Sequence, residues 1–311
     1  MHHLRLVSFN LHNLGREDNP DAGVYESKLE YLSDVLRRID GDLVVVNEVR
    51  EADSFKELVE RLAYPTYHLA DPPVEQRRIQ VGIMSRLPVL AANQWLEYPT
   101  VLPHEPGVVE QRAFRRPMPW VKVRLPNDET LFLLGVHLKS RRAELEGFKM
   151  DVPQRRQYVL GRALSASMRM LEAAGLRLLM DEVMDAGFAD HFAVAGDYNA
   201  GPDSLTTVFV TGLGEEEGGD AAVNERRRLL PSSWKLPAER AFSYVRRGRR
   251  ELIDHILVSQ RLSLCMTAAG VENQLLEAAA RSRWESGSGY PRSDHAPVWA
   301  DFRMPPAVKR A

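Results

Sequence analysis

The segment HFAVAGDYNAGPDS places two oxygen-bearing side chains directly after an apolar run. Gly196 allows the backbone to turn, and Asp197 and Asn199 are two positions apart, so both side chains would lie on the same side of an extended chain. Two oxygen ligands at this spacing can share one site. Because neither ligand is a thiolate, the pair favours a hard divalent cation, Mg²⁺ or Mn²⁺ with Ca²⁺ as an alternative, over structural zinc.

Three further carboxylates interrupt or follow apolar runs. Glu48 comes after the run in DLVVVNEV, Asp254 stands in the middle of ELIDHILVS, and Asp294 precedes the apolar end of SDHAPVWADF. Burying a carboxylate costs free energy unless a cation or a hydrogen-bond donor meets it. Asn10, at the end of LRLVSFN, offers a neutral oxygen ligand, although an Asn there is more often a turn residue.

Two histidines occur in comparable positions. His137 lies in LFLLGVHLKS, where a core or surface histidine is as plausible as a functional one, but the cations Lys139 and Arg141 follow it and favour phosphate chemistry. His295 directly follows Asp294, and an imidazole beside a carboxylate has the tautomer and basicity that proton transfer requires.

The elements that must position these residues can be predicted from hydrophobic periodicity. Helical patterns cover residues 26–39 and a long insertion around 154–186, which lengthens the path from His137 to Asp197 and suggests either a helical hairpin or lid beside the cleft or an outer-layer pair of helices. No fixed repeat or composition break divides the chain, so we expect a single domain over 1–311. Strand patterns occur at 4–11, 42–46, 79–85, 120–125, 130–138, 191–195, 251–258 and 296–302.

Composition limits the classes of function. With 311 residues and 44% hydrophobic content the chain can bury a large core. A formal net charge of -2 provides no global positive field, so a phosphate-rich partner must be bound locally. The single cysteine, Cys265, excludes a disulfide framework, and no apolar run has membrane length. We expect a cytoplasmic monomer, with a trimmed secretion signal as the alternative.

The motifs SFN, LVVVNEV, VGIMSRLPV, GVHLKS, AGDYNA, ELIDHILVS and SDHAPV, in this order, resemble the endonuclease/exonuclease/phosphatase (DNase I-like) superfamily. The resemblance spans residues 6 to 302, and the wording is nearest to bacterial DNase-like members. It implies an α/β fold, a four-layer α/β/β/α sandwich of two packed mixed β-sheets. It also implies that strand-end loops form the active site at one edge of the sandwich.

The resemblance further implies a role for each motif residue. Glu48 is similar to the principal metal ligand of the family, with Asn10 and Asp294 beside it. Asp197 and Asn199 resemble the pair that orients the attacking water and contacts the phosphate. The remaining candidates are the general base or phosphate-polarising imidazole His295, the residue that holds it, Asp254, and a second phosphate-facing imidazole, His137.

Substrate choice follows less directly. Some relatives of the DNase type pair the residue equivalent to His137 with an acid near 75–80, where this chain has Glu75 followed by basic residues. The GVHLKS motif argues against abasic-site, lipid and inositol-phosphate specialists. We therefore expect a nuclease of low sequence specificity that uses Lys139, Arg141, Arg247 and Arg249 to contact phosphates. The alternatives are an enzyme acting on a small-molecule or lipid phosphoester, and a pseudoenzyme that only binds a phosphorylated partner.

Overall fold

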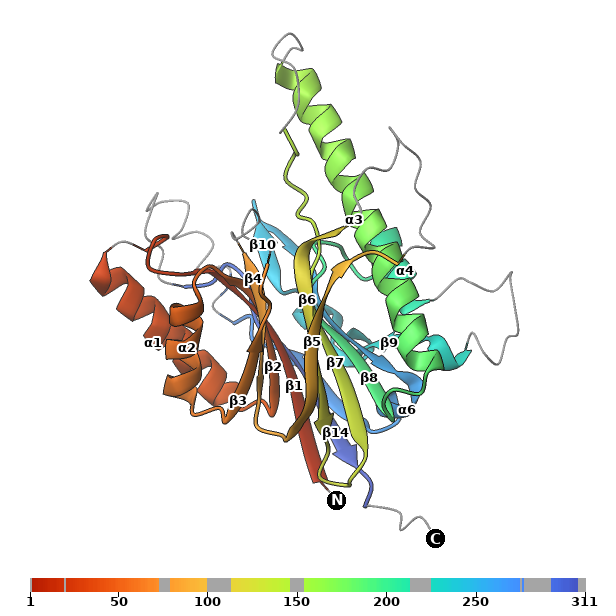
Figure 1. The fold of residues 1–311 in the computed structure, drawn as a ribbon. Coiled ribbons are helices and arrows are strands. Elements are labelled where there is room, and N and C mark those ends of the chain that lie inside the picture. Colours follow the sequence, from red (N-terminus) through yellow and green to blue (C-terminus); the bar gives the residue numbers. More distant parts are fainter. Residues whose placement is uncertain are drawn as a thin grey trace.

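Two six-stranded mixed sheets form the centre of the fold in Figure 1. The computed structural model describes residues 2–19, 21–72, 79–99, 113–145, 154–212, 225–274, 276 and 292–306. The first sheet has the order β13 (Met266–Val271), β14 (Val298–Met304), β1 (His2–Leu14), β2 (Leu43–Val49), β4 (Gln80–Ser85), β3 (Thr66–Leu69). The second has the order β5 (Val89–Glu97), β6 (Ala113–Arg124), β7 (Thr130–His137), β8 (His191–Asp197), β12 (Asp254–Ser259), β9 (Leu229–Pro231).

Each sheet has a parallel pair at its centre, β1–β2 in the first and β7–β8 in the second. The strands beside each pair, β14 and β4 in one sheet and β6 and β12 in the other, run antiparallel to it. The carboxyl ends of all four central strands lie at the end of the sandwich away from the two termini (Figure 1).

Apolar side chains fill the three spaces between the four layers of helices and sheets. Residues such as Val45, Leu133 and Ile256 meet between the sheets. Helices α1 (Ala22–Ile39) and α2 (Ala52–Leu62) cover the outer face of the first sheet, whereas α3 (Gln154–Asp185) and α4 (Leu205–Thr211) cover that of the second (Figure 1). The α/β/β/α sandwich predicted from sequence is confirmed.

The chain also contains elements that the periodicity did not predict. They include α2, the edge strands β3, β5 and β13, and a hairpin formed by β10 (Tyr244–Arg246) and β11 (Arg249–Glu251). Short edge strands with mixed burial do not show a clear two-residue alternation. Three short helical turns complete the described part: η2 (Ser232–Lys235), η3 (Ala238–Arg240) and α6 (Gln260–Ser263).

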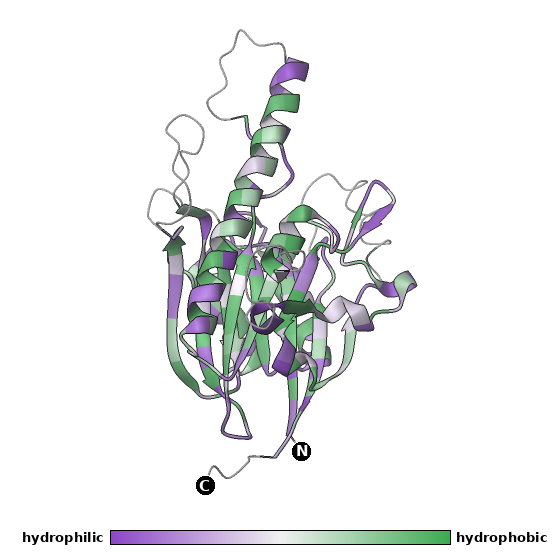
Figure 2. Ribbon diagram, turned by 90° about the vertical axis from the view of Figure 1, so that its right-hand side faces the viewer, coloured by the Kyte–Doolittle hydropathy of each residue, from purple (hydrophilic) through white to green (hydrophobic). Residues whose placement is uncertain are grey.

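The predicted pair of helices around 154–186 is wrong, because this stretch forms the single 32-residue helix α3. Gly161 does not break the helix: it permits close packing, since a Cβ there would lie 2.3 Å from the carbonyl oxygen of Glu144. The carboxyl half of α3 packs on the second sheet, and the amino half projects beyond it (Figures 1 and 2). Among the helices of the described ranges, none has the length and hydropathy to cross a bilayer.

Candidate active site

The polar strand ends meet in a cleft of about 450 Å³ at the carboxyl ends of the two parallel pairs. The sheet register explains the convergence. His137 and Asp197 are partners on parallel β7 and β8, and Asp254, the first residue of β12, is the antiparallel partner of Asp197. Asp254 therefore begins a strand rather than interrupting one, which corrects the position expected from ELIDHILVS. The cleft is lined by Glu48, His137, Asp197, Asn199, Asp294 and His295, among other residues.

Asp197 and Asn199 come together through a turn, not along an extended chain. Asn199 has a φ of 51°, its backbone N–H donates to Asp197 Oδ1 at 2.8 Å, and its side-chain amide donates to the carbonyl of Leu138 at 3.1 Å. Gly196 is required just before them, because a Cβ would lie 1.9 Å from the carbonyl oxygen of Val136 on β7. The two residues share a site as predicted, but by a different geometry.

Glu48 is held at the end of β2 by donors from β1. The side-chain amide of Asn10 donates to Glu48 Oε1 at 3.2 Å and to Asp197 Oδ2 at 3.1 Å, and the backbone N–H of Asn13 donates to Glu48 Oε2 at 3.1 Å. Asn10 thus connects a carboxylate of the first sheet with one of the second. His12, Asn13 and Glu48 all have positive φ, a concentration of strained backbone that is typical of functional sites.

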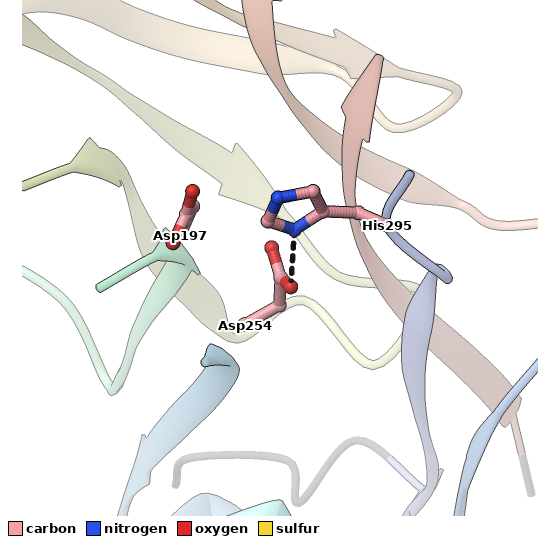
Figure 3. Close-up of side chains that lie close together, drawn as sticks. All are labelled: Asp197, Asp254 and His295. Atoms are coloured by element: carbon pink, nitrogen blue, oxygen red, sulfur yellow. Dashed lines mark hydrogen bonds and ion pairs between the residues drawn. The ribbon is translucent and has the colours of Figure 1, made fainter. Parts of the chain in front are cut away.

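A chain of hydrogen bonds through Asp254 holds His295 against β12. Its Nδ1 lies 2.8 Å from Asp254 Oδ2, and Ser243 Oγ donates to the same carboxylate oxygen at 2.6 Å. Figure 3 shows the imidazole of His295 joined to Asp254 by a hydrogen bond, with Asp197, from the strand next to that of Asp254, to one side of the ring. The side chains of these three residues bring one ligand atom each within 4.8 Å of one another, and all three are buried. The structure thus places the imidazole of His295 against the Asp254 carboxylate, as expected from the sequence.

The surrounding charges set the protonation of this cluster. Burial lowers the pKa of His295, but the negative charge of Asp254, its hydrogen bond and the charges of Asp197 and Asp294 outweigh burial and raise that pKa to about 10. Burial, reinforced by the charge of Asp254, raises the pKa of Asp197 to about 7. In the absence of a metal ion, His295 is therefore the cationic member of the cluster.

His137 is the neutral imidazole of the site. Burial, together with the positive charges of Arg116 and His295, holds the pKa of His137 well below its ordinary value. Its Nε2 lies 3.6 Å from Asp197 Oδ2, and its Nδ1 has no hydrogen-bond partner within the described ranges. The acid considered as its partner, Glu75, lies outside the described residues.

The predicted phosphate contacts are only partly brought to the cleft. Arg141 lines it and makes a two-pronged ion pair with Glu251. Lys139 is buried and its ammonium group lies 3.6 Å from Glu144 Oε2, and Lys139 is not among the residues that line the cleft. Arg247 and Arg249 are exposed at the turn between β10 and β11 and do not line the cleft. The cations that line it besides Arg141 are Arg116, Arg142 and Arg246.

The donor set fits a hard divalent cation, because carboxylates from both sheets line one cleft whose described lining contains no sulfur ligand. Beside the cleft, in the cluster with Asp197 and His295, Asp254 Oδ1 is fully buried with no hydrogen-bond partner among the described residues, and a cation could meet it there. Asn10 Oδ1 accepts from the backbone N–H of His12 at 2.9 Å. Its amide must therefore rotate before its oxygen can bind a cation beside Glu48.

Sequence reasoning missed the residues that support the site. The Asn47 amide donates to the Val136 carbonyl and accepts from the backbone N–H of Asp197, which joins β2 to both central strands of the other sheet. Glu172 of α3 accepts from the backbone N–H groups of Lys139 and Arg115. Asn47 could have been found from its place next to Glu48, whereas nothing in the local sequence distinguishes Glu172.

Comparisons with known proteins point to one family and one fold. The sequence model of the Endonuclease/Exonuclease/phosphatase family matches residues 7–295. A search of curated proteins found no match. An endonuclease/exonuclease/phosphatase from Bacteroides vulgatus is similar in structure, with a TM-score of 0.63, 14% identity, and coverage of 98% of this chain and 100% of the other.

Two other solved structures show the same fold. An endonuclease/exonuclease/phosphatase from Beutenbergia cavernae has a TM-score of 0.56 and 19% identity, and the match covers 98% of this chain and 72% of that one. Truncated Caenorhabditis elegans TDP2 has a TM-score of 0.58 and 12% identity, with 97% and 98% of the two chains covered. Because the sequence identities of these structures are 19% or lower, their similarity shows the fold of this chain and nothing further.

Proposed function

The chain belongs to the endonuclease/exonuclease/phosphatase family, a family of metal-dependent phosphoric ester hydrolases, and within it we propose that this protein is a divalent-metal-dependent nuclease of low sequence specificity. The proposal rests on the convergence of carboxylates, the imidazoles of His12, His137 and His295, and four arginines in the lining of one cleft. A phosphodiester anion repels an attacking hydroxide, so its hydrolysis requires both charge neutralisation and a base.

The carboxylate side of the cleft is the proposed metal site. Glu48 and Asp294 would hold the cation, with Asn10 after rotation of its amide, and Mg²⁺ or Mn²⁺ suits these oxygen donors. A cation bound there would supply positive charge next to the phosphate oxygens. Asn10 and Asn13 already orient the Glu48 carboxylate by hydrogen bonds to its two oxygens.

The other side of the cleft handles protons. His295, cationic beside Asp254, would donate from Nε2 to a phosphate oxygen. Of the two roles that the sequence suggested for His295, general base and phosphate-polarising imidazole, this is the second. Asp197, with a pKa raised to about 7 by burial and Asp254, would accept the proton of the attacking water. Asn199 fixes the Asp197 carboxylate through its backbone N–H, and His137 faces the same carboxylate as a neutral imidazole.

The test is cleavage of plasmid DNA and single-stranded oligonucleotides with Mg²⁺, with Mn²⁺ and with EDTA. We expect metal-dependent cleavage by the wild-type protein and none by His295→Ala. His3→Ala is the matched control, because His3 is an exposed histidine on the first residues of β1, at the far end from the cleft. The proposal is wrong if no nucleic acid is cleaved with either metal, and His295 has no role if its variant keeps the wild-type rate.

Hydrolysis of a small-molecule or lipid phosphoester is the second candidate, because a cleft of about 450 Å³ has the size of a small-ligand site. The net charge of -2 is compatible with it. Turnover of a nitrophenyl phosphodiester under the same conditions separates the two candidates. A higher kcat/KM on the small ester than on any polynucleotide would favour the second.

A further inference from the structure

The projecting half of α3 carries positive charge and no negative charge. Residues 154–171 contain four arginines and no Asp or Glu. Three of them, Arg155, Arg162 and Arg169, are spaced by seven residues, which places them in one stripe along the helix. At a rise of about 1.5 Å per residue, the stripe extends over about 21 Å, the axial rise of about six base pairs of duplex DNA.

The lower end of this stripe reaches the rim of the cleft. Arg169 donates to the carbonyl of Lys139 at 3.1 Å, and the hydroxyl of Ser165 donates to the carbonyl of Arg142, which lines the cleft. These contacts fasten α3 to the segment that follows β7. The stripe and the arginines that line the cleft are thereby continuous.

The upper end of the stripe is open to solvent. Arg155 and Arg162 are exposed, and no carboxylate of the described residues lies within ion-pair distance of either. Tyr158 is 49% exposed and lies one helical turn before Arg162, so its ring is accessible to a flat partner. Figures 1 and 2 show this half of α3 clear of both sheets, on the side of the molecule opposite the termini.

From this arrangement we infer that α3 is a binding surface for the polynucleotide substrate, with Arg155, Arg162 and Arg169 contacting backbone phosphates about three nucleotides apart, outside the cleft. The inference rests on the proposed nuclease function and assigns its substrate to long nucleic acids. Spaced guanidinium groups bind phosphates through paired hydrogen bonds, and an exposed aromatic ring between them suits an unpaired base. The charge explains how a protein of net charge -2 holds a polyanion locally.

The experiment compares Arg155→Ala/Arg162→Ala with the control Arg38→Ala/Arg303→Ala, which removes the same charge from exposed positions at the ends of α1 and β14. Affinity for a labelled oligonucleotide long enough to span α3 is measured by fluorescence anisotropy in EDTA, between about 50 and 200 mM salt. We expect the α3 variant to bind about tenfold more weakly at low salt, and its salt slope to fall by about 1.4–1.8, because two phosphate contacts are lost. The control should match the wild type.

If the α3 variant and the control have equal salt slopes of binding, the inference about α3 is wrong and the proposed nuclease function is unaffected. Oligonucleotide binding without cleavage would contradict the nuclease function but retain the α3 surface. Leu160 and Leu164 are also exposed on this helix half. Binding of the wild type to anionic phospholipid vesicles, with no affinity for the oligonucleotide, would therefore assign α3 to a lipid surface and overturn the inference.

Discussion

Replacement of Ser243 by Ala removes three hydrogen bonds beneath the imidazole of His295. The fully buried hydroxyl donates to Asp254 Oδ2 at 2.6 Å, and it accepts from the backbone N–H groups of Ile253 and Asp254, each at 3.1 Å. Asp254 Oδ2 is the atom that also bonds His295 Nδ1. The substitution therefore acts on the support of the site and not on a group that contacts substrate.

The cost follows from the number and kind of bonds lost. A hydrogen bond to a charged group contributes about 1.5–3 kcal/mol, and a buried N–H left without an acceptor costs about 1–3 kcal/mol. With values near the middle of these two ranges, loss of the Asp254 bond together with one orphaned N–H gives a destabilisation of about 3–5 kcal/mol. That is a large fraction of the roughly 5–15 kcal/mol by which a folded domain exceeds its unfolded state.

Urea unfolding followed by tryptophan fluorescence measures this difference. The matched control is Ser8→Ala, because Ser8 is also fully buried but its hydroxyl has no hydrogen-bond partner among the described residues. We expect the Ser243 variant to lose about 3–5 kcal/mol with an unchanged m-value, and the Ser8 variant to lose less than about 1 kcal/mol. Equal midpoints for the two variants would refute the support assigned to Ser243.

Two further predictions use the same protein. Gly196→Ala should lower the free energy of unfolding by more than about 4 kcal/mol, because the added Cβ would lie 1.9 Å from a carbonyl oxygen of β7. The control Gly201→Ala, which has open space around its Cβ, should lower it by less than about 1 kcal/mol. Similar losses for the two variants would contradict this prediction. In EDTA, the thermal midpoint of the wild type should fall as pH rises from about 6.5 to 10, because the Asp254 charge raises the pKa of His295 to about 10. The stabilisation from protonated His295 is complete below the pKa of the unfolded state and is lost as His295 deprotonates. His295→Gln should flatten the dependence of the midpoint on pH, and parallel curves for the two proteins would argue against a charged His295.

The nature of the site was readable in the sequence because its residues are chemically conspicuous. Glu48 and Asp197 follow apolar runs and Asp254 interrupts one, positions where a carboxylate is costly without a partner, and the central strands were predictable from the same runs. The order of the motifs then indicated the α/β/β/α sandwich. All of this information is local, or depends only on the order of segments along the chain.

Which residues meet was decided by the tertiary structure. The register of β7, β8 and β12 brings His137, Asp197 and Asp254 together, and a turn with positive φ at Asn199 completes the pair that an extended chain was expected to form. Strand pairing and turn conformation depend on contacts between segments distant in sequence, which residue types alone do not specify.

The residues that support the site and its cationic residues also depend on both the sequence and the tertiary structure. Ser243 is indistinguishable in sequence from a turn serine, and its role exists only because the Asp254 carboxylate lies 2.6 Å from its hydroxyl. Lys139 was expected at the phosphate because it follows His137, yet its ammonium group pairs with Glu144 and Lys139 does not line the cleft. Sequence by itself determined the chemical groups and the strands that carry them. The tertiary structure alone decided their direction and partners, because both depend on the neighbours that packing supplies.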